Sequence, residues 1–459
     1  MKIGSFPRSS VRSGAPGQRG AVLVIVLWIA FGLVSLALYF GDSMTFEFRA
    51  SDAQTAGVEA EQAIEGAARY VAYVFTNNVA GGRLPDTNTF LYNGVRVGEA
   101  TFWLIGRQDA EYPTDLPVCG LIDEASKINL NAPWLTATQL LSLPRMTAEL
   151  AASIMDWRDT DETVTPGGAE SITYARLDSP YLCKNTNFET VAELHLVMGA
   201  TAEILYGEDA NLNGFLEANE NDGNASLPYD NADGRLDPGL MEYVTVYSRE
   251  PNKRSDGVTN QVSLTQPQAV RALLRDVLGA TVAGPITVTN RIGPPFFRSP
   301  LEFYRKNVSR LTAAQFGQVA DALSATTNSY TVGLVNVSTA PAAVLACLPG
   351  IDTLETAQSL VTYRRAHLDQ LTSVAWVWDS NILDAPSADR LGPCITSRSY
   401  QCMADVAAVG HQGRGYRRTR FVFDKSDGTS RVVYRQELSR MGWALGALPQ
   451  TLTLAKNLR

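Results

Sequence analysis

The chain opens with an apolar segment that is long enough to cross a membrane. Residues 21–40 are apolar throughout and contain no charged residue. At about 1.5 Å per residue, a helix of this length spans the roughly 30 Å hydrocarbon core of a bilayer. Asp42 and Glu47 follow the segment, and the basic residues that precede it are Lys2, Arg8, Arg12 and Arg19. This asymmetry predicts a cytoplasmic N-terminus, with the rest of the chain on the other side of the membrane.

A cleaved secretory signal and an ordinary membrane anchor are the two simpler interpretations of this segment. The apolar run exceeds the roughly 7–15 residues of a signal h-region, and no small-x-small cleavage site follows it.

The helix is expected to continue beyond the apolar segment with an amphipathic pattern. Apolar residues recur at steps of three and four, as in one face of a helix: Phe46, Ala50, Ala53, Gly57, Ala60, Ile64, Ala67, Val71 and Val74. Gly57 weakens the helix locally, and Asn77-Asn78 with Gly81-Gly82 are expected to end it. The pattern predicts a long helix that is apolar all round at its start and amphipathic later, with a juxtamembrane coiled coil as the alternative.

Strand patterns lie on both sides of a large helical region. Residues 94–105 predict a strand or hairpin, and three alternating segments follow at 399–409, 416–424 and 430–438. Residues 243–248 predict a further strand, whereas 262–278 and 300–323 have helical patterns. The expected fold class is therefore α+β, with a long N-terminal helix, an antiparallel sheet and a large, mainly α-helical inserted domain.

The helical region contains an internal repeat. One copy starts at Ile128 and the other at Val335, and each has a strand-like Asn segment, a helix, Leu-Pro-x-Met or Leu-Pro-x-Ile, and a second helix with Arg158 or Arg364 near its end. Two short helices around a tight turn also occur in helix–hairpin–helix modules, which bind DNA phosphates through turn amides. DNA binding or uptake by a membrane-anchored protein is therefore an alternative function, although protein scaffolding fits the same pattern.

Charge and cysteine content narrow the function further. The 459-residue chain has a formal charge of −8, and this acidic balance argues against nucleic acid as a partner. Five cysteines form no CxxC motif, so a zinc site is not expected, and Cys394 with Cys402 is the closest pair for a disulfide. We also find no GxSxG, HExxH or P-loop motif and predict no enzyme activity.

Residues 209–220 match the calcium-loop pattern D-x-[DN]-x-[DN]-G-x5-E. The predicted ligands alternate along the loop, and Gly214 permits its sharp turn. Side-chain or main-chain oxygens would come from Asp209, Asn211, Asn213, Phe215, Glu217 and Glu220. A structural Ca²⁺ is the expected cofactor, and a solvated loop is the alternative.

Two other acidic stretches are weaker candidates. Residues 230–237 contain an Asn-x-Asp-Gly core and could form a second cation site or complete the first. Residues 156–162 and Glu170 place carboxylates after the end of a helix, where unsatisfied carbonyls already make the environment negative. A bound cation, arginines from another segment, or simple solvation would relieve this repulsion.

The motifs resemble those of component K of type II secretion systems, a large minor pseudopilin. The resemblance is carried by Gln18-Arg19-Gly20 before the apolar helix, Leu27-Trp28 within it, residues 123–131 (DEASKINLN) and the DWRDTD…GGAE run from Asp156 to Glu170. Ser126 stands where the family has glycine. Ile25 stands where most pilins carry glutamate at the fifth mature position, which suits a subunit with no neighbour above it.

The resemblance implies maturation, localisation and partners. A prepilin peptidase would cut between Gly20 and Ala21, and the mature protein would remain in the inner membrane, single-pass, with its bulk in the periplasm. Its partners would be the other minor pseudopilins, I and J foremost and possibly H. The family is also known for calcium in its helical domain.

The resulting organisation has five parts. It comprises a prepilin leader (1–20), a transmembrane helix (21–40), a pilin-like helix with first strands (41–128), the inserted α-helical domain with two repeats and the calcium loop (129–385), and the C-terminal strands (386–459). The expected function is a non-enzymatic scaffold at the tip of the secretion pseudopilus. A type IV pilus minor pilin is the other alternative.

Overall fold

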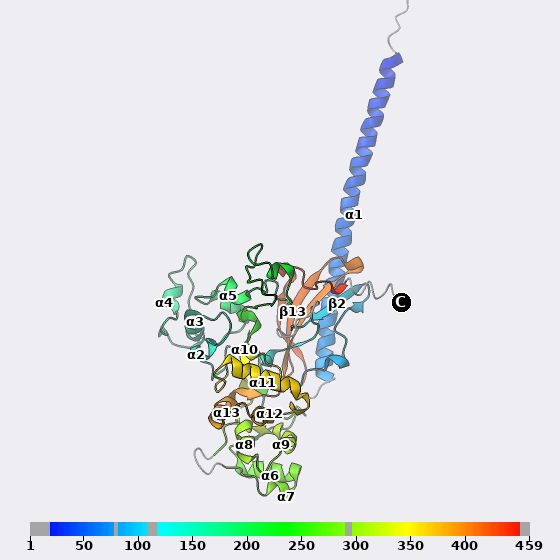
Figure 1. Cartoon of the computed structure of the whole chain (residues 1–459). Coiled ribbons are helices and arrows are strands. Elements are labelled where there is room, and N and C mark those ends of the chain that lie inside the picture. The colour runs from blue at the N-terminus through cyan, green and yellow to red at the C-terminus, as the bar shows by residue number, and fades with distance from the viewer. Residues whose placement is uncertain (1–18, 78–80, 109–116, 290–295, 450–459) are drawn as a thin grey trace, which may run out of the picture.

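The computed structural model describes residues 19–77, 81–108, 117–289 and 296–449, and its dominant feature is one long helix (Figure 1). Helix α1 runs from Arg19 to Asn77 and has 59 residues, so it is about 90 Å long. Its first half extends away from the rest of the molecule, and its second half lies along the sheet. Within the described residues, α1 is the helix that is long and apolar enough to cross a membrane. The predicted continuous helix is confirmed, including its end at Asn77.

The sheet beside α1 has six strands, and its central strand comes from near the C-terminus. Its order is β1-β2-β12-β13-β14, with β3 paired to β12 as well, and all pairings are antiparallel. The strands are β1 Val95–Val97, β2 Ala100–Ile105, β3 Ile122–Asp123, β12 Gln401–Val409, β13 Arg417–Asp424 and β14 Arg431–Glu437. The predicted strands at 94–105 and after residue 398 thus form one sheet, and together with α1 they make the pilin-like part of an α+β fold.

Side-chain alternation lets the sheet pack on both faces. On one face, Phe102, Ala404 and Phe421 join the core with α1, to which the helix contributes residues from Ala60 to Phe75. On the other face, Trp103 and Ala407 pack against the segment that includes Leu445. All nine residues of β12 are buried, which is why this strand is more apolar than a half-exposed strand would be.

A hairpin loop fixes α1 to the sheet. His411, between β12 and β13, accepts or donates at both ring nitrogens: Nδ1 lies 2.7 Å from Glu59 Oε2, and Nε2 lies 2.8 Å from Asp52 Oδ1. Arg414 pairs with the same Asp52. The helix continues unbroken through Gly57, where a Cβ atom would lie 3.0 Å from the Arg417 guanidinium. Gly57 therefore makes room for a side chain of the sheet.

The helical region between β3 and β12 consists of three successive units, each closed by two short parallel strands. The pairs are β4 (Ile128–Asn129) with β5 (Val244–Thr245), β7 (Val262–Ser263) with β8 (Leu323–Ser324), and β10 (Val335–Asn336) with β11 (Ile395–Thr396). In each unit the residue after the opening strand donates its N–H to the last residue of the closing strand: Leu130 to Thr245, Leu264 to Ser324, and Val337 to Thr396.

The first and third units correspond to the predicted repeat, and the second unit was not anticipated. The first contains α2 Ala137–Leu140, α3 Ala148–Arg158, α4 Ser171–Tyr174 and α5 Ala202–Tyr206; the second contains α6 Pro267–Leu278, α7 Ala280–Ala283, α8 Pro300–Asn307 and α9 Ala313–Ala320; the third contains α10 Ala342–Leu345, α11 Leu354–Ala366, α12 Ala375–Asp379 and α13 Ala385–Leu391. The helical predictions for 262–278 and 300–323 were wrong at their ends, because Val262–Ser263 and Leu323–Ser324 are the closing strands of the second unit. The strand predicted at 243–248 is limited to β5.

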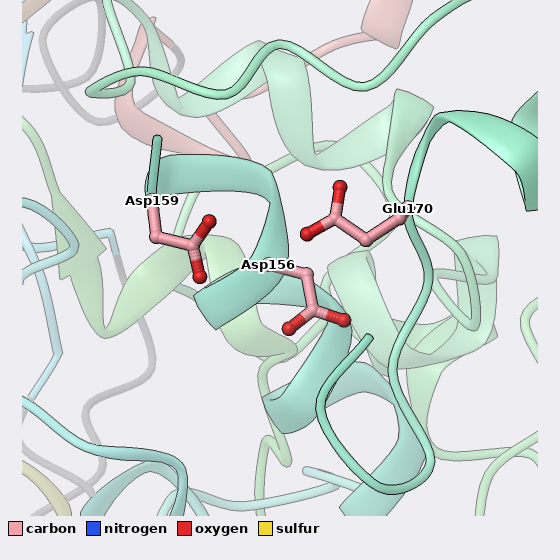
Figure 2. A group of neighbouring side chains, drawn as sticks. All are labelled: Asp156, Asp159 and Glu170. Carbon is pink, nitrogen blue, oxygen red and sulfur yellow. The ribbon is translucent and has the colours of Figure 1, made fainter. Parts of the chain in front are cut away.

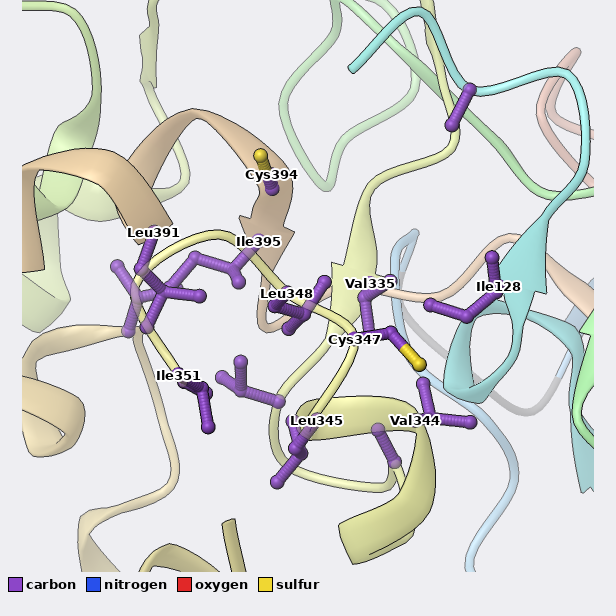
Figure 3. Packing of buried hydrophobic residues seen from close by; sticks show 14 of the residues in the cluster. Ile128, Val335, Val344, Leu345, Cys347, Leu348, Ile351, Leu391, Cys394 and Ile395 are labelled. Carbon is purple, nitrogen blue, oxygen red and sulfur yellow. The ribbon is translucent and has the colours of Figure 1, made fainter. Parts of the chain in front are cut away.

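The three units share one hydrophobic core, and a further antiparallel pair links them, β6 (Arg249–Pro251) with β9 (Tyr330–Val332). Figure 3 shows part of this core, where Leu348, Ile351 and Leu391 of the third unit pack together and Ile128 of the first unit lies near Val335. Cys347 is buried there as a small apolar side chain, as predicted.

The predicted Cys394–Cys402 disulfide is wrong, because all five cysteines are free in the structure. Cys394 belongs to the core of the helical units, whereas Cys402 lies on β12 in the core between α1 and the sheet. Nearness in sequence was misleading because the chain passes from one core to the other between the two residues.

Candidate metal sites

The predicted calcium loop is a compact, buried turn rather than a solvated loop. Asp209, Asn213 and Glu220 are each 1% exposed, and Asn211 is 6% exposed. Glu217 and Phe215 are partly buried. The loop follows α5, which ends at Tyr206, and finishes in a short 3-10 helix at Ala218–Glu220. Burial of so many polar groups requires partners for their oxygen atoms.

Many of the loop's side-chain oxygens bind its own amides. Asp209 accepts hydrogen bonds from the N–H groups of Asn213 and Gly214, at 2.9 Å each, and Asn211 Oδ1 accepts from Asn213 N–H at 2.9 Å. Glu220 accepts from the N–H groups of Ala210 and Glu217. The carboxylate of Glu217 accepts from the side-chain amides of Asn211 and Asn213. The five predicted side-chain ligands are therefore gathered into one hydrogen-bonded cluster.

The electrostatics of this cluster fit a cation. Burial, together with the charges of Asp209 and Glu217, raises the pKa of Glu220 to about 8. Burial is also the main cause that raises the pKa of Asp209 and of Glu217. The three carboxylates repel one another when charged, and side-chain amide oxygens lie beside them. Oxygen donors of these kinds are the ligands that a hard cation binds. The residues present thus fit calcium in chemistry and in clustering.

A buried charge cluster, which sequence reasoning missed, fastens this loop to the sheet. Arg418, on β13, donates to both carboxylate oxygens of Asp405 on β12 at 2.8 and 2.7 Å, and to the carbonyls of Asn211 and Leu212 at 2.5 and 2.7 Å. Arg420 donates to Asp405 and to the Leu212 carbonyl as well. The two arginines hold the pKa of Asp405 far below its usual range, against the opposing effect of burial. Charged residues at alternate positions of a predicted strand were the available signal.

The second acidic tract forms a separate turn on the surface. Asp230 accepts hydrogen bonds from the N–H groups of Asp222, Gly223 and Ala232, and these lower its pKa against the opposing effect of burial. Gly234 donates to Asn221 Oδ1 at 2.9 Å. Asp237 instead pairs with Arg145 at 2.7 Å, and its N–H binds Glu208. The tract is tied to neighbouring residues 221–223 and to Glu208, rather than to the six predicted ligands.

The acidic run after α3 brings three carboxylates close together. Oxygens of Asp156, Asp159 and Glu170 all lie within 4.8 Å of one another (Figure 2). Asp156 and Glu170 are 0% exposed, so the solvated-loop interpretation is wrong for these two residues. The arginine interpretation is not supported either, since no ion pair between these acids and a lysine or arginine occurs among the described residues.

In both helix–turn–helix segments, the turn that would bind a phosphate is engaged by other residues of the protein. The turn of the third unit has Gly350 at φ 95°, and a Cβ there would lie 2.3 Å from the Ser387 carbonyl oxygen. At the equivalent turn of the first unit, Arg145 has φ 60° and pairs with Asp237. One turn is covered by α13 and the other directs its arginine to an acid, which argues against the DNA-binding alternative.

The leader and the cleavage position can be placed only in part. Residues 1–18 lie outside the described residues, whereas Gly20 and Ala21 fall in the first turn of α1. Side chains of the apolar segment from Val22 to Phe40 are exposed, including Leu27 at 54% and Trp28 at 81%. An apolar surface of this size needs lipid or other helices around it, which agrees with a single membrane anchor.

Comparison with known proteins relates one segment of the chain to a secretion protein family. Residues 126–206 match the model of the first domain of type II secretion system protein K. No curated protein matches the chain. Among solved structures, a chain of the GspK-GspI-GspJ complex from the enterotoxigenic Escherichia coli type 2 secretion system is similar, with 11% identity and a TM-score of 0.33. The match covers 82% of this chain and 95% of that one.

The matched segment includes most of the first helical unit and the whole carboxylate group of Asp156, Asp159 and Glu170, and it stops before the loop at 209–220. It also includes part of the motif run that suggested the resemblance to component K. Through this segment, the chain is similar to the family of type II secretion system protein K.

Proposed function

We propose that the chain is a minor pseudopilin at the tip of a type II secretion pseudopilus, where it acts as a non-enzymatic scaffold. The observation that carries this proposal is the difference between the two halves of α1. The first half is apolar and exposed, and the second half packs against the pilin-like sheet. Such a helix inserts into lipid and then packs beside equivalent helices in a filament.

The position at the tip is supported by bulk and by the sequence of the rod. The three helical units lie beside and below the sheet, away from the apolar half of α1 (Figure 1). A domain of this size would obstruct close stacking if it recurred along a filament. Ile25 adds to this argument, because a subunit at the end has no following neighbour whose N-terminal amine would need an acid.

The partners of this subunit would be the minor pseudopilins I and J, with H as a further candidate. The test is co-purification of the tagged full-length chain, in detergent, with I and J from the same genome. A stable complex in which α1 cross-links to the partner helices is the expected result. Its absence, together with normal secretion in a deletion strain, would overturn the proposal, and loss of pili without loss of secretion would favour a type IV pilus subunit.

Maturation is part of the same proposal. A prepilin peptidase would cut between Gly20 and Ala21 on the cytoplasmic side, leaving the protein in the inner membrane with its bulk in the periplasm. Intact-mass measurement of the membrane-extracted protein should give an N-terminus at Ala21, and Gly20→Ala should block the cleavage. An N-terminus after Phe40 would contradict the proposal.

The loop at 209–220 would hold a structural Ca²⁺ through Asp209, Asn211, Asn213, Phe215, Glu217 and Glu220. Support comes from the burial of these residues and from the raised pKa of Glu220. An ion there would balance charge in a turn that Arg418 and Arg420 fasten to the sheet, and so would stabilise the contact between the helical units and the pilin-like part. Asp209→Ala with Glu220→Ala should remove one calcium equivalent in a binding titration. Unchanged stoichiometry would contradict this assignment.

A further inference from the structure

A large cavity lies where the segment after α1 meets the second and third helical units. Its volume is about 690 Å³, which is within the range of roughly 300–1,000 Å³ that is typical of small-molecule sites. The residues that line it come from 81–84, from β6, and from both of these units. Protein interiors leave few voids larger than a water molecule, so a cavity of this size requires an explanation that the scaffold role does not supply.

The segment after α1 is fixed against the wall of the cavity by backbone contacts. Gly81 donates its N–H to the Ser255 carbonyl at 3.1 Å, and the Gly82 carbonyl accepts from the Ser399 N–H at 3.0 Å. A Cβ at Gly82 would lie 2.8 Å from Nε of Arg398, so the absence of a side chain permits this close approach. A ligand in the cavity would therefore contact both the pilin-like part and the helical units.

The most deeply buried acid of the wall, Asp123, is already bound by donors of the protein. Its side chain accepts from Asn336 Nδ2 at 2.9 Å and from the Thr339 hydroxyl at 2.6 Å. The Ser399 hydroxyl and the Ala125 N–H donate to the other carboxylate oxygen. Four hydrogen bonds use most of the acceptor capacity of a carboxylate, so Asp123 has little left to offer a ligand.

The two other acids of the wall share one arginine. Nη1 of Arg398 lies 3.3 Å from Oε1 of Glu250 and 3.6 Å from Oδ1 of Asp321, and the side chains of Arg398 and Glu250 are only 12% and 13% exposed. Glu250 also accepts from the Thr396 hydroxyl at 2.7 Å, and Asp321 accepts from the Ser255 N–H at 2.8 Å. The negative charges of the wall are thus engaged within the protein.

Two further arginines of the wall differ in this respect. Arg83 and Arg298 both line the cavity and are exposed, so they mark where it meets solvent. Neither guanidinium forms an ion pair with an acid among the described residues. Hydroxyl groups are also frequent in the wall, including those of Ser324, Ser338 and Thr372. Guanidinium and hydroxyl groups donate hydrogen bonds to anionic oxygens, so this lining favours a negatively charged ligand.

We propose that the cavity binds a small organic anion, with its carboxylate or phosphate group against Arg83 and Arg298. Its carbon body would lie against the apolar side chains of the wall, which include Leu323, Leu334 and Val374. The volume favours an organic molecule, because a single inorganic ion would occupy only a small part of 690 Å³. The cavity is separate from the loop at 209–220, since its lining comes from other segments. A bound anion would link the segment after α1 to both helical units.

The test is calorimetric titration of the full-length protein in detergent, at an ionic strength held constant with sodium chloride. The probes are glutarate, glucose 6-phosphate and, as the neutral counterpart, glucose. Saturable binding of glutarate or glucose 6-phosphate, at one equivalent, is expected, and the tighter of the two identifies the anionic group as carboxylate or phosphate. The proposal is overturned if neither anion binds, or if glucose binds as tightly as glucose 6-phosphate.

Three variants locate the binding. Arg298→Gln should weaken the anion roughly tenfold, because one charged donor is lost, whereas Arg275→Gln, an exposed arginine of α6 outside the lining, should leave Kd unchanged. Gly317 lies on α9 in the wall, and a Cβ there would meet the Thr372 hydroxyl at 3.4 Å, an ordinary contact. Gly317→Leu should therefore fill the cavity and abolish binding without unfolding the protein, since leucine favours a helix over glycine.

The melting temperature of each variant without ligand shows that it is folded. Unchanged binding by folded Gly317→Leu would overturn the assignment to this cavity. Equal weakening by Arg275→Gln and Arg298→Gln would overturn it as well, because the attraction would then belong to the general surface charge.

Discussion

The first and third helical units have the same framework but close it by different means. In both, an asparagine of the opening strand caps the next turn: Asn129 accepts from the N–H of Asn131, and Asn336 accepts from the N–H of Ser338. In both, an arginine of the second helix binds carbonyls that follow the opening strand, Arg158 in the first and Arg364 in the third. The framework is therefore set by hydrogen bonds to the backbone.

The difference lies in what fills the remainder of each unit. The third unit closes within 62 residues, from Val335 to Thr396, and its turn packs against α13. The first unit extends from Ile128 to Thr245, and its additional length carries the carboxylate group, the 209–220 loop and the Arg145–Asp237 pair. The first unit shares the apolar core, and its additional length is held by charged and hydrogen-bonded side chains and, as we propose, by a cation in the 209–220 loop.

The largest expected effect comes from the turns. Gly350→Ala places a Cβ 2.3 Å from a carbonyl oxygen at a positive φ, and strain with overpacking should cost about 4 kcal/mol of unfolding free energy. Arg145→Gly relieves a positive φ but removes a partly exposed ion pair, so its change should stay within about 1 kcal/mol. Urea unfolding measures the free energy of unfolding of both variants. A similar decrease for Gly350→Ala and Arg145→Gly would contradict the proposed difference between the two turns.

The next prediction tests the shared framework. Arg158→Met and Arg364→Met each remove the donor to the carbonyls that follow the opening strand. Each substitution should lower the free energy of unfolding by about 3 kcal/mol. Hydrogen exchange of the amides near Leu130 and Val337 should report the local loosening. A large decrease in stability for one of these variants and none for the other would show that the two units are not equivalent.

Removal of calcium should affect only the first unit. At free calcium about one hundred times Kd, a single site stabilises the folded protein by about 2.7 kcal/mol. Chelation should therefore speed hydrogen exchange in residues 209–220 and leave exchange in residues 335–396 unchanged. Faster exchange in the third unit as well would mean that the ion stabilises the common core instead.

The smallest effect concerns pH and a region outside both units, the junction of α1 with the sheet. Hydrogen bonds to Asp52 and Glu59 raise the pKa of His411, and hydrogen bonds from His411 lower the pKa of both acids. The histidine's contribution is complete below its unfolded pKa of about 6.5 and is lost as pH rises through its folded pKa. The acids contribute above their unfolded pKa values of about 3.9 and 4.3 and lose this as pH falls.

The junction should therefore be most stable between about pH 4.5 and 6.5. Limited proteolysis near residues 410–416, measured from pH 4 to 9, checks this window. His411→Gln should flatten the upper limb of the profile, and exchange in the two helical units should show no such window.

Much of the fold could be predicted from periodicity. The stripe from Ala60 to Val74 and the alternation in 416–424 gave α1 and its sheet, because each buries one side of a regular element. The second unit was missed because its closing strands, Val262–Ser263 and Leu323–Ser324, have two residues each. Strands this short carry no periodic signal, and their pairing joins residues 61 positions apart.

The candidate sites were visible as composition but not as geometry. The acids of residues 156–170 and 209–220 are easily read, yet their burial follows from packing that no local pattern encodes. The contact of Arg418 with the Asn211 and Leu212 carbonyls joins β13 to a loop about 200 positions earlier. In the sequence, only the charged residues of β13 indicated that polar groups of another segment cover that face of the sheet.

The pairing of β2 with β12 has a consequence for the order of folding. Ile105 lies opposite Asp405, so the middle of the sheet cannot form until the ribosome has completed nearly the whole polypeptide. The helical units rely on contacts nearer in sequence and can fold before the C-terminal strands are available, since low contact order favours early folding. The sheet is thus completed last, and a chain that ended before β12 would keep the apolar helix α1 without the strands on which its second half packs.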